Sequence, residues 1–416
     1  MNDRLKLFVA RQPIFDRTRK VFAYELLFRS GQDNYFSHTN QDQASTRVIH
    51  DSLFIHGLDK LLAGKKGFVN ITRQTLLDGT VNILPKDHFI LELLEDIPAD
   101  KEVIHACQAL KKQGYTLALD DFIDAPHLQS LADVADIIKI DFLAVKHQER
   151  EAIAKRYLAK NKILLAEKVE TESDFKHAIS LGYHYFQGYF FCRPQMMYGH
   201  DIPSFKVNYM RFLAALSKKE LDFLEIEDII KQEVSLAVKI LRYLNSVAYH
   251  RKHQVTSIKQ ALALLGESSI KQWAMLMTVN GLGKDKPEEL VLTALIRARF
   301  CELLAPLFHL QSFQSDLFIL GMLSLMDALV DQPMPYVLEE LAISTQIKQA
   351  LMGMHNELSP VYYFVSAYEQ GKWQNILYWQ ADIDVEESDI STLYEEAILW
   401  AQKIYEPQTE AAIDSL

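Results

Sequence analysis

The sequence predicts a two-domain protein in which an α/β barrel is followed by an all-α domain. Short apolar runs alternate with amphipathic helical stretches from Phe8 to about Phe191. After Pro194 the alternation stops, and nearly all later stretches have helical periodicity. A chain of 416 residues is also long enough for two or three domains of about 150 residues each.

Seven runs in the first half are typical of buried parallel strands, because they are apolar on both faces and lie between helical stretches. They are Val21–Leu27, Phe68–Ile71, Phe89–Leu93, Thr116–Leu119, Ile137–Ile140, Ile163–Ala166 and Tyr185–Phe186. The helical stretches between them are Ala44–Phe54, Glu102–Lys112, Glu151–Ala159 and Glu172–Ile179. So many strands in so short a stretch favour a barrel of parallel strands over a doubly wound sheet.

The second half changes character near Ser204. Ile229–Leu244 and Ile258–Leu265 have apolar residues three and four positions apart, which is the period of an amphipathic helix. No strand-like run recurs there with the earlier regularity. The sequence therefore predicts a barrel domain over residues 1–203, a helical domain over 204–405 and a tail over 406–416.

Composition excludes several classes of function. A net charge of −11 argues against coating nucleic acid or an anionic membrane surface, although a bound metal ion can make one pocket receptive to phosphate. The three cysteines lie far apart, which argues against a zinc or disulfide scaffold and fits a reducing cytosol. The N-terminus has no signal-peptide pattern and no apolar run approaches a membrane span. We expect a cytoplasmic protein that binds neither nucleic-acid polymers nor membranes.

Polar side chains stand at the end of each predicted strand. In chain order they are Glu25, Asn70, Glu92, Asp120 with Asp121, Lys139 with Asp141, Glu167 with Glu170, and Gln187. A single carboxylate after a strand is usually a helix N-cap, but here polar residues recur from strand to strand. Because a parallel barrel gathers the carboxyl ends of its strands on one face, these side chains are expected to converge in one pocket.

Such a pocket would hold several carboxylates, which cannot all stay ionised unless a cation is bound. Oxygen ligands without Cys or His suit Mg²⁺ or Mn²⁺ rather than zinc. Lys139, in the same set, could orient a water molecule or a phosphate oxygen. Two such cations about 4 Å apart are typical of phosphodiester hydrolysis, whereas carboxylate-bound Mg²⁺ with a lysine base is typical of enolate chemistry. The residue types alone leave both reactions open.

The order of the motifs favours phosphodiester hydrolysis, because the first half of the chain closely resembles the EAL domain family. The resemblance runs from about Phe8 to Pro194 and rests on short motifs that match in order. They are Tyr24–Arg29, Val69–Asn70, Leu91–Glu95, Asp120–Phe122, Ile138–Asp141, Ala166–Glu170 and Gln187–Tyr189. The resemblance implies a TIM-like barrel that hydrolyses the bacterial second messenger cyclic di-GMP to the linear dinucleotide.

The resemblance also implies a role for each matching residue. The implied metal ligands are Glu25, Asn70, Glu92, Asp120 and Glu167, with Asp121 at a second metal, and the metal is Mg²⁺ or Mn²⁺. The resemblance places Lys139 near the attacking water. The catalytic residues that it implies are Lys139, Glu167 and Asp121. Arg29 is expected on a phosphate of the substrate and Gln187 on the substrate side. Glu95 resembles the family's glutamate that steadies a neighbouring loop.

The chain departs from the family's pattern directly after the paired aspartates. The family continues with Phe-Gly-small-Gly, whereas this chain reads Phe122-Ile123-Asp124-Ala125-Pro126. Glycine permits a positive φ that isoleucine disfavours, and Pro126 restricts Ala125. Two hypotheses therefore stay open: a cyclic di-GMP phosphodiesterase, and a weakly active or inactive cyclic di-GMP receptor or scaffold.

Residues from about 204 to 400 resemble the HDOD domain, a helical output module related to metal-dependent HD phosphohydrolases. The match rests on Asp228–Asn245, Ser257–Ala261 and Leu264–Gly266. The His-Asp dipeptide that an HD metal site needs occurs only at His50-Asp51 and His200-Asp201, outside this domain. We therefore expect a regulatory or output module without chemistry of its own. The resemblance of the whole chain implies a cyclic di-GMP signalling protein that acts through the messenger on motility or biofilm formation. A protein partner for the helical module, and a homodimer, are open alternatives.

Overall fold

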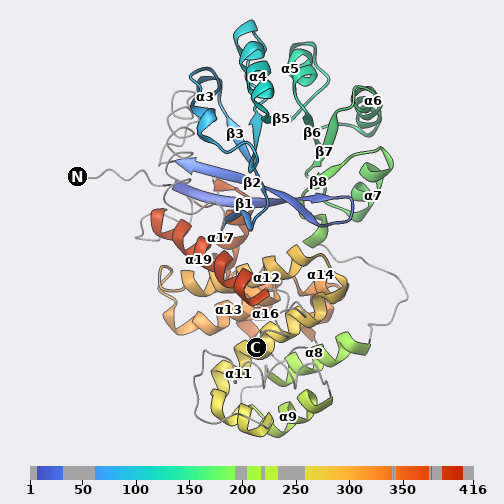
Figure 1. The fold of residues 1–416 in the computed structure, drawn as a ribbon. Helices are drawn as coiled ribbons and strands as arrows, with labels where there is room; N and C mark the ends of the chain where they lie inside the picture. Colours follow the sequence, from blue (N-terminus) through green and yellow to red (C-terminus); the bar gives the residue numbers. More distant parts are fainter. Residues whose placement is uncertain are drawn as a thin grey trace, which may run out of the picture. The chain divides into compact units, whose positions relative to one another are not determined.

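The computed structural model describes two compact units of the chain. The described residues are 7–30, 61–192, 204–216, 221–232, 258–339, 341, 343–373, 376 and 387–405. One unit contains residues 1–191 together with 364–403, and the other contains 192–363 with 404–416. The first unit is built around a β-barrel and the second is helical (Figure 1).

Eight strands close the barrel in chain order, which confirms the predicted fold (Figure 1). They are β1 Leu7–Asp16, β2 Val21–Ser30, β3 Lys66–Ile71, β4 Phe89–Leu93, β5 Thr116–Leu119, β6 Ile137–Asp141, β7 Ile163–Glu167 and β8 Tyr185–Gln187. Strands β2 to β8 contain the seven predicted runs, and their ladders are parallel.

The first strand corrects the expectation of an all-parallel barrel. β1 pairs antiparallel with both β2 and β8. Only residues 17–20 separate β1 from β2, and so short a connection permits an antiparallel pair but no parallel crossover. Sequence patterning missed β1 because Arg11 and Gln12 interrupt its apolar run.

Helices follow most of the parallel strands, and local capping explains where they start and stop. They are α3 Arg73–Leu77, α4 Lys101–Gln113, α5 Gln129–Val134, α6 His147–Leu158 and α7 Glu172–Ser180. The carboxylate of Asp100 accepts a hydrogen bond from the Val103 amide at the start of α4, and Gly114 ends that helix in the left-handed conformation. The helix predicted over Ala44–Phe54 lies outside the described residues.

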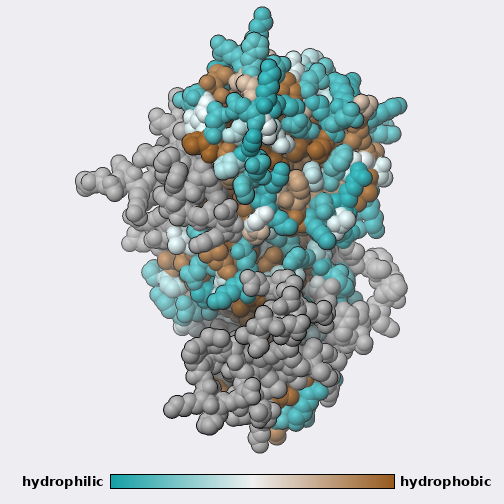
Figure 2. All heavy atoms as spheres, viewed as in Figure 1, coloured by the Kyte–Doolittle hydropathy of each residue, from teal (hydrophilic) through white to brown (hydrophobic). Residues whose placement is uncertain are grey.

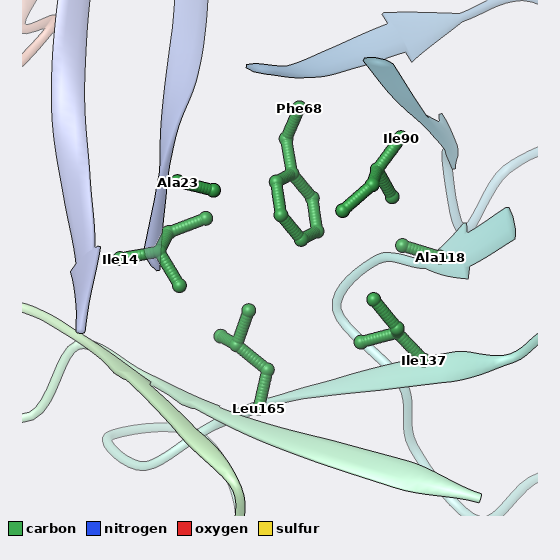
Figure 3. Packing of buried hydrophobic residues seen from close by; sticks show 7 residues of the cluster. All are labelled: Ile14, Ala23, Phe68, Ile90, Ala118, Ile137 and Leu165. Carbon is green, nitrogen blue, oxygen red and sulfur yellow. The ribbon is translucent and has the colours of Figure 1, made fainter. Parts of the chain in front are cut away.

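The interior of the barrel is an apolar layer in which most strands contribute one side chain. Figure 3 shows these side chains pointing toward one another from the surrounding strands. They are Ile14, Ala23, Phe68, Ile90, Ala118, Ile137 and Leu165. The polar residues of the site form the next layer of side chains, directly above this apolar layer.

The barrel unit also contains helical residues from near the C-terminus. They come from the end of α17 (Ser359–Glu369) and from most of α19 (Glu387–Tyr405). Residues 364–403 belong to the compact unit of the barrel, although the sequence analysis placed them in the helical domain. The buried Tyr368 hydroxyl donates a hydrogen bond to the backbone oxygen of Val9 on β1, at 3.0 Å. Helical periodicity shows that such a segment is helical but not which unit it joins.

The second unit is helical throughout its described part. Its helices are α8 Ser204–Leu216, α9 Phe223–Gln232, α11 Ile258–Leu282, α12 Glu288–Leu304, α13 Gln314–Leu323, α14 Met326–Val330, α15 Met334–Glu339 and α16 Thr345–Leu351. Of the predicted Ile229–Leu244 helix, only residues up to Gln232 are described. No helix in the described ranges is both long and apolar enough to cross a bilayer. Hydrophilic residues cover much of the described surface in Figure 2, as expected for helices with one face in water.

Candidate active site

The polar site is the layer directly above the apolar layer of the barrel. Side chains two positions apart on a strand point to the same face. The residues two positions after the apolar layer on β2 to β7 are Glu25, Asn70, Glu92, Asp120, Lys139 and Glu167. Period-two geometry therefore places six of the predicted site residues on the inner face, one strand after another.

Lys139 lies at the centre of the acidic residues. Its ammonium nitrogen lies 2.8 Å from Oε1 of Glu167, 2.9 Å from Oδ1 of Asp120 and 3.3 Å from Oε2 of Glu25. It also forms an ion pair with Glu92. The Lys139 side chain is only 1% exposed, so its ammonium group is held away from water. One ammonium group cannot neutralise four carboxylates, which leaves the cluster short of positive charge.

The pKa values of the cluster reflect this imbalance. Burial raises the pKa of Glu92 well above its usual value and raises the pKa of Glu167 to about 8. Burial opposes the ionisation of Asp120, but the adjacent Lys139 outweighs it and lowers the pKa of that carboxyl. Burial likewise opposes the charge on Lys139, yet the surrounding carboxylates hold its pKa well above the usual range. Without another cation, the cluster therefore keeps protons on some of its carboxyl groups.

Three buried oxygens of the cluster have no hydrogen-bond donor among the residues that the structure describes. They are Oδ1 of Asn70, Oε2 of Glu92 and Oε2 of Glu167. A buried acceptor without a donor costs about 1–3 kcal/mol, and native proteins contain few of them. Glu25, Glu92 and Glu167 each offer an oxygen within 4.8 Å of the others. This arrangement of hard oxygen donors fits a divalent cation such as Mg²⁺ or Mn²⁺.

A second acidic group lies beside the first. Glu95, Asp120 and Asp121 also offer carboxylate oxygens within 4.8 Å of one another. Burial, with the nearby Asp120 carboxylate, raises the pKa of Asp121. Lys168 is the nearest described cation to Asp121, at 3.8 Å. The sequence analysis gave Glu95 a role in steadying a loop. Its place three residues after Glu92, where β4 ends, is the signal that could have indicated a ligand.

Gln187 lies beside Glu25 and contacts a residue that the sequence analysis missed. Its Nε2 donates a hydrogen bond to Oε2 of Glu25 at 2.8 Å and another to Oε1 of Gln12 at 3.1 Å. Gln12 lies opposite Glu25 in the β1–β2 ladder. Applying period two to β1 would have found it, since Gln12 is two positions from Ile14 of the apolar layer.

The structure describes the side chains of Leu26 and Asp141 but not that of Arg29. Arg29 lies in β2, but its side chain is outside the described part of the chain. Leu26 is fully buried and points away from Glu25, as expected from the alternation of a strand. Asp141 accepts hydrogen bonds from the amides of Leu143 and Ala144, so it caps the turn after β6 and forms no part of the Lys139 cluster.

The loop that departs from the family's pattern is anchored to α6. Both carboxylate oxygens of Asp124 accept hydrogen bonds from Nη1 of Arg156, at 2.6 and 2.7 Å. Ile123 beside it is 51% exposed. The paired aspartates are therefore followed by Ile123, an exposed apolar residue, and by Asp124, which forms an ion pair with Arg156 of α6.

Comparisons with known proteins agree with the motifs and the fold. The EAL domain family matches residues 3–194 and the HDOD domain family matches residues 202–352. An uncharacterized protein of Bacillus subtilis (strain 168), YuxH, is 35% identical over 96% of this chain and 99% of its own length. This chain belongs to the EAL domain family. It is an EAL–HDOD protein, and the resemblance seen in the sequence is confirmed.

A second relative carries a functional name. CdgJ of Vibrio cholerae serotype O1, named a cyclic di-GMP phosphodiesterase, is 30% identical over 95% of this EAL–HDOD chain and 93% of its own length. The solved structure of Klebsiella pneumoniae BlrP1 with calcium and cyclic di-GMP is 20% identical, covers 45% of this chain and 56% of that chain, and has a TM-score of 0.38. A structural similarity of that size carries no weight for function.

The HDOD part shows no comparable chemistry in its described residues. In those ranges, no three His, Cys, Asp or Glu side chains of the helical unit lie close enough to share a metal ion. His50-Asp51 and His200-Asp201 lie outside the described residues. The carboxyl-rich site of this protein is thus in its barrel.

Proposed function

We propose that this protein binds cyclic di-GMP at the mouth of its barrel and hydrolyses it to the linear dinucleotide with Mg²⁺ or Mn²⁺. The observation that carries the proposal is the buried cluster around Lys139, in which oxygens of Asn70, Glu92 and Glu167 have no hydrogen-bond donor within the described part of the chain. The substrate is inferred from the family and from CdgJ, which is related over nearly the whole chain.

The chemistry divides between the cation and the side chains. A divalent cation held by Glu25, Asn70, Glu92, Asp120 and Glu167, with Asp121 at a second position, would polarise the phosphodiester as a Lewis acid. Hydrolysis forms a bond between the water oxygen and phosphorus and breaks the bond from phosphorus to one ribose oxygen. The water loses a proton and the departing ribose oxygen gains one.

The side chains near this reaction are assigned three kinds of role. Asp121 accepts the proton of the attacking water. Lys139 and Glu167 hold the attacking water in line, with the Lys139 ammonium attracting the phosphodiester charge. Arg29 binds a phosphate of the substrate through its guanidinium group, and Gln187 lies on the substrate side.

A second candidate function is a cyclic di-GMP receptor or scaffold with little or no turnover. It is favoured by the loop after Asp121, where Ile123 is exposed and Asp124 is tethered to Arg156. The loop after the paired aspartates is thereby held to α6. The two functions share the binding site and differ only in whether the phosphodiester is cleaved.

Product analysis separates the two functions. Full-length protein is incubated with cyclic di-GMP and excess Mn²⁺ or Mg²⁺, and the nucleotides are resolved by chromatography. Linear dinucleotide from the wild type and from Glu151→Gln, an exposed α6 control, but not from Glu25→Gln, would support the phosphodiesterase. Calorimetric binding without product at any metal concentration would replace it with the receptor. Neither binding nor product would overturn both.

The helical domain is proposed to be a non-catalytic module that engages a protein partner. In its described part it lacks a metal-ligating cluster, so its contribution is expected to be an interaction rather than a reaction. A homodimer is an open alternative, and sedimentation equilibrium of the full chain, with and without cyclic di-GMP, tests it. A single monomeric species under both conditions would contradict the dimer.

A further inference from the structure

The segment 364–403 lies outside both family matches and still belongs to the barrel unit. Tyr368 anchors it, because its buried hydroxyl donates to the backbone oxygen of Val9 on β1. The ring of Trp373 packs edge-on against Tyr368 with centroids 5.4 Å apart, and Tyr394 of α19 packs on it at 4.9 Å. The EAL barrel of this protein therefore carries an addition from the far end of the chain.

The addition meets the barrel at the site end of β1 and β2. Gly371 has a φ of +62°, and a Cβ added to it would lie 2.7 Å from Cδ1 of Leu27. Leu27 is two positions after Glu25 on β2, so both side chains point to the same face and Leu27 lies nearer the mouth. We call residues 368–371 the C-terminal turn.

A short series of hydrogen bonds connects the C-terminal turn to the acidic cluster. Nε2 of Gln12 donates to the backbone oxygen of Glu369 at 3.5 Å, a weak contact that is longer than the roughly 2.7–3.2 Å of an ordinary N–H···O bond. Oε1 of Gln12 accepts from Nε2 of Gln187, which also donates to Glu25. Two glutamine side chains thus lie between the C-terminal turn and a carboxylate of the candidate metal site.

We propose that Gln12 is a positioning residue that holds Glu25 through Gln187, and that the C-terminal turn sets the position of Gln12. Groups that hydrogen-bond metal ligands fix the orientation of those ligands, and their loss typically reduces metal affinity or activity. The inference rests on the proposed function, since it concerns the same site.

The first test removes both hydrogen bonds of Gln12 while keeping a side chain of similar length. Gln12→Met is expected to weaken Mn²⁺ binding to the full-length protein by about tenfold or more in isothermal titration calorimetry. Gln108→Met, an exposed glutamine of α4, is the matched control and should bind Mn²⁺ as the wild type does. Equal Mn²⁺ affinity in the two variants would overturn the role of Gln12.

The second test moves the C-terminal turn without altering the cluster. Gly371→Ala places a methyl group against Leu27, whereas Gly64→Ala imposes similar left-handed strain, at φ +71°, with no atom within 4 Å of the added Cβ. Gly371→Ala is expected to weaken Mn²⁺ binding and Gly64→Ala is not. If Gly371→Ala does not fold, as judged by circular dichroism, Tyr368→Phe takes its place, because it removes the bond to Val9 and keeps the ring.

Combining the two changes tests whether they act by one route. The double variant carries both Gln12→Met and Gly371→Ala. Its Mn²⁺ affinity should be close to that of the single variant with the lower affinity, because the effects of coupled substitutions are not additive. Fully additive losses, or Gly371→Ala behaving as Gly64→Ala, would overturn the inference. Wild-type protein that binds Mn²⁺ but does not hydrolyse cyclic di-GMP would remove the phosphodiesterase and leave this inference standing. Wild-type protein that binds no Mn²⁺ would overturn both.

Discussion

The ammonium nitrogen of Lys139 lies 2.8 Å from Oε1 of Glu167, within a layer of carboxylates that rests on the apolar floor of the barrel. The two residues come from adjacent strands, β6 and β7. Their contact shows that the cluster is partly neutralised from within. On the proposed function, a metal ion would share these carboxylates with the lysine, and the stability of the barrel should then be sensitive to both.

Replacing Lys139 by methionine should make the fold depend on metal. Lys139→Met keeps a long side chain but leaves buried carboxylates without their ammonium partner, and breaking a buried pair costs about 3–5 kcal/mol. We expect the free energy of unfolding to fall by about that amount without metal and to recover partly with excess Mn²⁺. Urea unfolding with and without Mn²⁺ measures both. Lys160→Met, at a largely exposed pair with Asp133, should cost at most about 1 kcal/mol; an equal loss in both variants would contradict the prediction.

Removing the amide of Asn70 should affect metal binding. Its Oδ1 has no hydrogen-bond donor among the described residues, so it is available as a metal ligand. Asn70→Ala is expected to weaken Mn²⁺ binding by at least about tenfold, as loss of groups at metal sites typically does. Calorimetric titration checks this, with the exposed Asn82→Ala as the control. Unchanged Mn²⁺ affinity in Asn70→Ala would remove this residue from the site.

Gly188 should tolerate no side chain. It follows Gln187 with a φ of +142°, and an added Cβ would lie 2.2 Å from the backbone oxygen of Val169. Backbone strain and overpacking each cost about 1–3 kcal/mol, so Gly188→Ala should lower the free energy of unfolding by at least about 2 kcal/mol. No described atom lies within 4 Å of a Cβ added at Gly64, so Gly64→Ala should lower the free energy of unfolding by less in the same urea titration. The reverse order of stability would show that the close approach is not maintained in solution.

The stability contributed by Asp100 should depend on pH. The Val103 amide, and then Arg73, hold the pKa of Asp100 below its usual value of 3.8. A carboxyl group with a lowered pKa in the folded state stabilises the fold above its unfolded pKa and loses that contribution as pH falls through the folded pKa. Asp100→Asn keeps a capping oxygen but cannot titrate there. The wild type should therefore exceed Asp100→Asn in stability near pH 7, and the difference should shrink below about pH 4. A difference independent of pH would contradict this assignment.

Much of the barrel and its site could be predicted because both depend on local patterns. The runs that became β2 to β8 are apolar on both faces, and the alternation of side chains on a strand places Glu25, Asn70 and Glu92 on one face. The motifs that identify the EAL domain are these same positions. Because strand direction and side-chain alternation are properties of neighbouring residues, they can be read without knowing the tertiary structure.

The antiparallel first strand and the place of Gln12 could not be predicted in the same way. Polar residues break the pattern of β1, and its pairing with β8 joins residues from the two ends of the barrel's sequence. The charge balance around Lys139 was also only partly predictable. The sequence indicated that a lysine and several carboxylates converge, but the pKa of Glu167 depends on how deeply the closed barrel buries it.

The amino-acid sequence alone was enough to predict strands β2 to β8, which are joined by parallel ladders. It also predicted the helical second half and the residues of the acidic layer. Only the folded chain decides that Gln12 meets the backbone of Glu369, 357 positions later. Periodicity reports which way a side chain points from its own helix or strand. It carries no information about which distant segment will cover it, because that depends on the packing of the completed barrel.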